Sequence, residues 1–197
     1  MGDLPRIRLR PLHLADAAVI AHWGDDSQFC VEADWATDVA APERYAFWRN
    51  LIENPPADLI RLGAVGDDGT SGRNVANHEQ DDVSTDKDVL LGYVDLHGTE
   101  SGRRELGYLI GQRSLWGRGL GISAALAGLH YAFDELQLHE VWAEALAANE
   151  PSVRILQRLG MRETGRGTDE TYLGRKTFHR QFAITSAEWR NSPADCG

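Results

Sequence analysis

The chain has 197 residues, of which 42% are hydrophobic, and its 30 acidic and 20 basic residues give a formal net charge of −10 at pH 7. This composition is typical of a globular domain, and the length is sufficient for a core that needs neither disulfides nor metal. The acidity argues against nucleic-acid binding through a broad basic face and favours cationic partners such as amines or basic peptides.

Cysteine and histidine usage gives no sign of a metal or disulfide scaffold. Cys30 and Cys196 lie far apart, and the seven histidines show no metal-ligand spacing, so we expect a reducing compartment and no metal site. The sequence shows no run of about 20 apolar residues and no signal-peptide pattern at its start. These features predict a cytoplasmic protein with neither a membrane nor a nucleic-acid partner.

Helical and strand patterns follow one another along the chain. Alternating or apolar runs predict strands over 6–11, 59–65, 89–96, 103–111, 139–146, 161–164 and 177–185. Apolar periodicity and capping residues predict helices over 17–23 with Asp16 as N-cap, 42–53, 122–136, and 150–159 with Asn149 as N-cap. Hairpins make the sheet mixed, so we expect an α/β (α+β) fold with a mostly antiparallel central sheet flanked by helices. One domain over 1–190 and a short tail over 191–197 follow.

The segment 67–88 is the most polar part of the sequence. It contains seven acidic residues against Arg73 and Lys87 and almost no large apolar side chain. Such a segment cannot bury enough apolar surface to order itself, so we expect a flexible loop. It is either a solvated surface excursion or a lid that recruits a substrate.

Aromatic residues gather in the first two predicted helices and the connection between them: Trp23, Trp35, Tyr45 and Trp48. They are either core packing or the wall of a cleft that holds a cation by its π-face. In the second case nearby carboxylates would assist, namely those of Asp25, Asp26, Glu32 or Asp34.

The stretch from Gln112 to Ile122 carries three alternate glycines between a strand and a long helix. Without Cβ atoms, such a backbone can direct successive N–H groups into one cavity, and the helix N-terminus adds partial positive charge. Arg113 and Arg118 can add charge-assisted contacts, so a diphosphate is the expected ligand. The stretch matches neither a Walker A loop nor a dinucleotide fingerprint. The alternative is a turn whose glycines only allow close packing.

Three blocks of sequence resemble the GNAT superfamily of N-acetyltransferases, in particular its RimJ/RimL-type branch. They are Arg-Glu-Leu-Gly-Tyr at 104–108, Trp-Gly-Arg-Gly-Leu-Gly at 116–121, and the run from Asn149 to Met161. Leu-Arg-Pro-Leu at 9–12, followed by Asp16-Ala17, extends the resemblance over nearly the whole chain. Each block is weak alone, but their order and separation are specific.

The resemblance implies the acyl-CoA N-acyltransferase fold and acetyl-CoA as co-substrate. The pyrophosphate would be held by backbone amides of Trp116, Gly117, Arg118, Gly119, Leu120, Gly121 and Ile122, with added charge from Arg118 and Arg113. The strand end formed by Leu109, Ile110 and Gly111 would pair with the pantetheine arm. Asn149 and Ser152 would face the arm near the sulfur.

The resemblance also suggests catalytic residues. Glu105 is the candidate general base, acting through a water; the alternative is that it pairs with an arginine or faces solvent. The backbone N–H of Leu109 is the candidate oxyanion donor. Many relatives carry a tyrosine acid at the position of Leu156, so Ser152 is the candidate donor to the leaving thiolate, or else only a helix-start hydroxyl.

The predicted function is acetyl transfer to a primary amine by direct attack in a ternary complex. The acceptor is either a protein N-terminal amine or a small cation such as a polyamine or an aminoglycoside. A non-catalytic acyl-CoA sensor is the alternative, and a homodimer is compatible with the resemblance.

Overall fold

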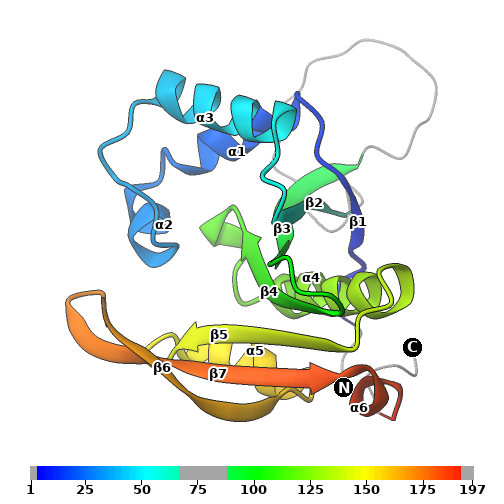
Figure 1. The fold of residues 1–197 in the computed structure, drawn as a ribbon. Helices are drawn as coiled ribbons and strands as arrows, with labels where there is room; N and C mark the ends of the chain where they lie inside the picture. The colour runs from blue at the N-terminus through cyan, green and yellow to red at the C-terminus, as the bar shows by residue number, and fades with distance from the viewer. Residues whose placement is uncertain (1–3, 67–87, 192–197) are drawn as a thin grey trace.

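A single seven-stranded sheet organises the computed structural model, which describes residues 4–66 and 88–191. The strand order is β1-β2-β3-β4-β5-β7-β6, and every neighbouring pair is antiparallel except β4–β5 (Figure 1). The strands are β1 (Arg8–Pro11), β2 (Leu59–Gly66), β3 (Val89–His97), β4 (Arg103–Ile110), β5 (Glu140–Leu146), β6 (Arg162–Tyr172) and β7 (Arg175–Thr185). The prediction of a mixed, mostly antiparallel sheet is confirmed.

The helices include all four that the sequence predicts. The α-helices are α1 (Asp16–Trp23), α2 (Ser27–Glu32), α3 (Ala41–Glu53), α4 (Leu120–His130), α5 (Glu150–Arg158) and α6 (Ser186–Arg190). α2 and α6 were not predicted because helices this short show no apolar period. The helix predicted over 122–136 is α-helical only to His130 and continues as a π-helical turn, η2 (Tyr131–Glu135).

Asp16 corrects one capping prediction. It is the first residue of α1 rather than its N-cap, and Ala15 occupies the cap position without a side-chain hydrogen bond. The buried Asp16 carboxylate accepts hydrogen bonds from both Nη atoms of Arg10 and from the His13 N–H, and these bonds hold its pKa below the ordinary value despite burial. Asp16 therefore ties α1 to β1.

The helices cover both faces of the sheet, and each face has its own core. On one face, a Cβ on Gly128 of α4 would meet the side chains of Val94 and Leu106, and α5 contributes Val153 and Leu156 to the same cluster. On the other face, α1 and α3 pack around Tyr93, which contacts Trp23 and Trp48. Because side chains alternate along a strand, consecutive residues of β3 and β4 serve different cores.

β4 and β5 stay together over a short distance only. Their parallel register joins Arg103 to Glu140, Arg104 to Val141 and Glu105 to Trp142, and ends there within the described residues. Beyond this point β5 pairs with β7, and Figure 1 shows β4 leaving in another direction. The second half of β4 therefore has one edge without a neighbouring strand in the described parts of the chain.

Several predictions fall outside the described residues. They include the acidic loop over 67–88, except for Asp88, which pairs with Arg8, and the tail over 191–197, except for Asn191. Among the helices of the described ranges, none combines the length and apolarity required to span a membrane.

Gly111, at the end of β4, is required for packing. A Cβ at this position would lie 2.0 Å from ring atoms of Trp23, which is 4% exposed. We expect Gly111→Ala to lower the free energy of unfolding by about 1–3 kcal/mol, the usual cost of overpacking, in urea denaturation. Gly107→Ala in the same strand is the control, because its Cβ would meet Asp95 at an ordinary 3.4 Å. Equal losses in the two variants would contradict this explanation.

Candidate active site

The glycine-rich loop joins η1 (Arg113–Leu115) to α4 and leaves a series of backbone donors open. Gly117 and Gly119 have φ values of +75° and +84°, in the region that favours glycine. Within the described parts of the chain, no group accepts a hydrogen bond from the N–H groups of residues 117–122. Successive open donors at a helix N-terminus form an anion-binding cradle.

Two details narrow the set of residues predicted to form this cradle. The Trp116 amide donates to the Arg113 carbonyl at 3.0 Å, so it is not available to a ligand. A Cβ on Gly121 would lie 3.1 Å from Cδ1 of Ile155, so the third glycine allows α4 and α5 to pack closely. The packing explanation thus holds for Gly121, whereas the φ values of Gly117 and Gly119 serve the cradle.

The two loop arginines are in different situations. The guanidinium of Arg113 lies 3.4 Å from both carboxylate oxygens of Asp26, the N-cap of α2. Arg118 is exposed and forms no ion pair with any residue in the described ranges. Arg118 is therefore the better placed of the two to meet an anion at the loop.

The end of β4 uses more of its own backbone groups than the sequence suggested. The indole Nε1 of Trp116 donates to the Ile110 carbonyl at 2.8 Å, and the Gly111 N–H donates to the Leu91 carbonyl at 2.9 Å. Leu109 lies opposite Tyr93 in the β3–β4 register. The Ile110 carbonyl and the Gly111 N–H are therefore already hydrogen-bonded within the protein. They are not available for the predicted pairing of Leu109–Gly111 with a pantetheine arm.

Glu105 lies at the last residue pair before β4 and β5 separate. It is half-buried, opposite His97 in β3 and Trp142 in β5, and forms no ion pair with the described residues. Burial raises the pKa of its carboxyl group, and the nearby Glu144 carboxylate raises it further. A half-buried carboxylate with a raised pKa beside a second carboxylate has the properties of a general base.

Glu144 is a residue that sequence reasoning missed. Its Oε1 accepts a hydrogen bond from Nε2 of Gln181 at 2.7 Å, across the β5–β7 register. His179 lies on the same strand as Gln181 and contacts the Thr168 hydroxyl at 3.2 Å. The register of the sheet brings these polar groups to the face that carries Glu105. No local sequence pattern could therefore have predicted that they lie together.

Ser152 lies in the first turn of α5. Its N–H donates to Oδ1 of Asn149 at 3.2 Å, which makes Asn149 the N-cap, as predicted. Its hydroxyl lies 3.0 Å from the phenol oxygen of Tyr108 in β4. Asn149 and Ser152 therefore form one unit at the start of α5, and sequence reasoning missed the contact with Tyr108.

Trp23 of α1 and Trp48 of α3 belong to the core, whereas Tyr45 of α3 is 42% exposed. Trp23 and Trp48 are each 4% exposed, and the cation above Trp48 and Tyr93 is the guanidinium of Arg61, at 5.1 and 4.5 Å from the ring centroids. Asp95 holds Arg61 through two hydrogen bonds of 2.6 and 2.5 Å. The protein itself thus fills the predicted cation site at these rings.

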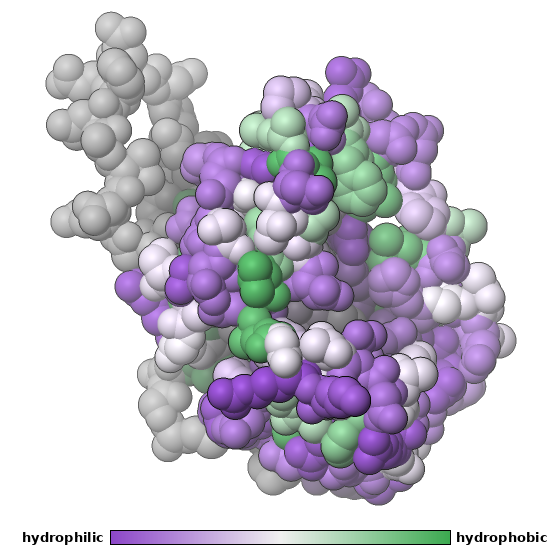
Figure 2. Space-filling view, turned by 90° about the vertical axis from the view of Figure 1, so that its left-hand side faces the viewer, coloured by the Kyte–Doolittle hydropathy of each residue, from purple (hydrophilic) through white to green (hydrophobic). Residues whose placement is uncertain are grey.

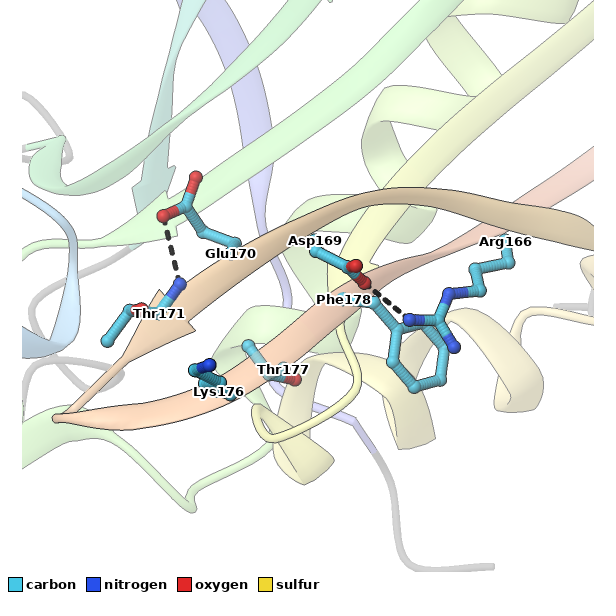
Figure 3. A pocket seen from close by; sticks show the side chains of 7 residues that line it. All are labelled: Arg166, Asp169, Glu170, Thr171, Lys176, Thr177 and Phe178. Atoms are coloured by element: carbon cyan, nitrogen blue, oxygen red, sulfur yellow. Dashed lines mark hydrogen bonds and ion pairs between the residues drawn. The ribbon is translucent and has the colours of Figure 1, made fainter.

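A cavity of about 510 Å³ lies on the β6–β7 hairpin, and its lining includes Arg166, Asp169, Glu170 and Lys176 (Figure 3). The Arg166 guanidinium stacks 4.0 Å from the Phe178 ring centroid. None of the predicted site residues lines this cavity. We therefore place the candidate active site at Glu105 and the glycine-rich loop, and not at the cavity. Figure 2 shows a mainly hydrophilic surface, with apolar residues in small groups.

The amino-acid sequence matches a known protein family and several curated proteins. The family model described as "Acetyltransferase (GNAT) domain" matches residues 6–162. The chain belongs to the GNAT acetyltransferase family.

Two curated relatives illustrate the similarity. The chain is 34% identical over 105 residues to a Bacillus subtilis protein named "Putative ribosomal N-acetyltransferase YdaF", covering 51% of this chain and 56% of that one. It is 32% identical over 91 residues to a Bacillus licheniformis protein named "Uncharacterized N-acetyltransferase p20", covering 46% of this chain and 51% of that one. The chain thus spans about half the length of the curated relatives it matches.

Solved structures share the fold at lower identity. A GNAT-family acetyltransferase from Bacillus anthracis has a TM-score of 0.69 at 17% identity, covering 94% of this chain and 98% of that one. The spermidine N-acetyltransferase of Vibrio cholerae, in complex with CoA and spermine, has a TM-score of 0.71 at 17% identity, covering 94% and 99%. These likenesses confirm the predicted fold.

The raised pKa of Glu105 makes a prediction about stability. The pKa of this carboxyl group is higher in the folded state than in the unfolded state. Its contribution to folding stability is therefore fully present at pH below the unfolded-state pKa, and it is lost as the pH rises through the folded-state pKa. The ionised Glu105 therefore opposes folding at neutral pH. We expect Glu105→Gln to raise the melting temperature at pH 7.5 relative to wild type, and to do so less at pH 4.5, in thermal denaturation monitored by circular dichroism.

The control for this measurement is Glu140→Gln. Glu140 accepts a 2.6 Å hydrogen bond from Arg103, so its replacement removes an ion pair and should not stabilise the protein. A lower melting temperature for Glu105→Gln at both pH values would show that Glu105 has a structural role.

Proposed function

We propose that the protein transfers an acetyl group from acetyl-CoA to a primary amine. The observation that carries this proposal is the cradle of open N–H groups over 117–122, on the loop that follows the strand bearing the half-buried Glu105. The family match and relatives named as N-acetyltransferases support it. The relative with a ribosomal name supports assignment to the RimJ/RimL-type branch.

The cradle fits the pyrophosphate of CoA. Gly117, Gly119 and the first turn of α4 supply amides, and the exposed Arg118 supplies a full positive charge. We propose that the pantetheine arm enters where β4 leaves β5, so that the thioester comes to lie between Glu105 and Ser152. The side chains of Ile110, Leu120 and Ile122 are buried in the core, so we propose that these residues offer backbone groups to the cofactor.

The reaction requires movement of a proton in each of its two halves. Glu105 accepts a proton from the acceptor ammonium through a water, and the neutral amine attacks the thioester carbonyl, forming the C–N bond. The Leu109 N–H is the proposed donor to the developing oxyanion. The C–S bond then breaks with its electron pair on sulfur, and the Ser152 hydroxyl donates a hydrogen bond to the departing thiolate. The second proton of the attacking nitrogen leaves to solvent as the neutral amide forms.

The charge around Glu105 favours an acceptor that arrives as a cation. Glu105 and Glu144 lie on one face of the sheet, and Arg103 is engaged with Glu140. The names of similar proteins mention a ribosomal N-acetyltransferase and a spermidine N-acetyltransferase, and spermidine presents primary ammonium groups. We propose a primary ammonium as the acceptor and a homodimer as the assembly.

A panel of amines tests the proposed function. We expect thiol release from acetyl-CoA, and a mass increase of an acetyl group on the acceptor, with peptides bearing free N-terminal amines or with polyamines and aminoglycosides. Glu105→Gln should lower kcat by about 10²-fold or more, the usual contribution of a general base. Tight CoA binding without turnover on any amine would indicate a sensor instead of an enzyme.

The two loop arginines allow a matched test of the cradle. We expect Arg118→Ala to weaken CoA binding about tenfold in isothermal titration calorimetry, because it removes a charge-assisted contact. Arg113→Ala should change the affinity less than threefold, because Arg113 is already paired with Asp26. Equal effects of the two substitutions, or no heat with the wild type, would contradict the assignment of the cradle.

A further inference from the structure

Tyr108 connects two elements that lie on either side of the proposed thioester path. It belongs to the part of β4 beyond the last residue pair with β5. Its side chain is on the face opposite to that of Glu105, toward α5, where its hydroxyl lies 3.0 Å from Oγ of Ser152 and 3.4 Å from the Ser152 carbonyl oxygen. A tyrosine 44 residues away in the chain therefore fixes the serine of the candidate site.

The hydrogen bond between the two hydroxyls can run in either direction. Both oxygens of Ser152 near the phenol can accept a hydrogen bond, and the carbonyl oxygen can only accept. Burial raises the pKa of Tyr108 to about 12, so the phenol stays protonated at neutral pH. When the phenol donates to Oγ of Ser152, one of the two directions that the geometry allows, the proton of the Ser152 hydroxyl is left to point elsewhere.

Ser152 is restrained from a second side as well. Its N–H is held by Oδ1 of Asn149, so both its backbone and its hydroxyl are fixed by side chains from other positions. A hydroxyl that accepts one hydrogen bond becomes a better donor in the next, because linked hydrogen bonds polarise one another.

We propose that Tyr108 is a positioning residue, which holds the Ser152 hydroxyl with its proton directed at the leaving thiolate of CoA. This inference rests on the proposed function. As the C–S bond breaks, the electron pair stays on sulfur and the Ser152 hydroxyl donates a hydrogen bond to it without giving up its proton. The released thiolate then takes a proton from solvent, which is feasible because a thiol pKa lies near 8.5.

The test compares Tyr108→Phe, Ser152→Ala and the double variant in steady-state kinetics with the best amine of the panel. We expect Tyr108→Phe to lower kcat about tenfold, with the KM for acetyl-CoA changed less than threefold, because the lost bond acts in the transition state. The double variant should be no slower than Ser152→Ala, because Tyr108 acts only through Ser152.

The control is Tyr131→Phe, which removes a phenol hydroxyl from a partly buried tyrosine in η2, away from the site. This variant should retain wild-type kcat. If Tyr108→Phe does not fold, 3-fluorotyrosine incorporated at position 108 keeps the ring and hydroxyl while strengthening the donor, and kcat should then stay equal or rise.

Each outcome of this test has one meaning. An unchanged kcat in Tyr108→Phe, a lower kcat with 3-fluorotyrosine, or a double variant whose loss is the product of the single losses would overturn the positioning role while leaving the proposed function intact. Absence of turnover by the wild type with every amine would overturn the proposed function, and this inference with it.

Discussion

The separation of β4 from β5 is the constraint on which the candidate site depends. Parallel pairing joins these strands through Glu105 and Trp142, and beyond that point β5 pairs with β7 instead. A strand edge left without a neighbour must satisfy its polar backbone groups in another way. The Trp116 indole satisfies the Ile110 carbonyl, and the proposed pantetheine arm would occupy part of the remainder.

Successive side chains of a β-strand point to opposite faces of the sheet, so the residues proposed to act in the reaction lie on both faces. Glu105 and Tyr108 are three residues apart in β4, so their side chains are on opposite faces. Glu105 shares its face with His97 and Glu144, whereas Tyr108 reaches Ser152 at the start of α5. An acyl group held between the strands would meet a base on one side and a donor to the leaving group on the other.

Much of the fold was predictable because its signals are local. Alternating apolar residues indicated the strands, and the glycine-rich loop was recognisable because left-handed φ values at Gly117 and Gly119 require glycine. The polar neighbours of Glu105 were not predictable, because the β5–β7 register and a bulge in β6 between Arg166 and Asp169 determine which groups come together. The contact between Tyr108 and Ser152 likewise depends on how α5 packs on the sheet.

The distribution of charge bears on how the proposed cationic acceptor would be held. Among the aromatic rings that the sequence offered for this purpose, Trp48 is covered by Arg61, and Asp95 fixes that guanidinium in place. A second cation over the same ring would have to displace a buried, hydrogen-bonded ion pair, which is costly. The carboxylates of Glu105 and Glu144 are only partly buried and form no ion pair within the described ranges, and the charge of Arg103 near Glu105 does not outweigh the burial and the Glu144 carboxylate that raise its pKa. These contacts support the proposal that a cationic acceptor is recognised by carboxylates rather than by the face of Trp48.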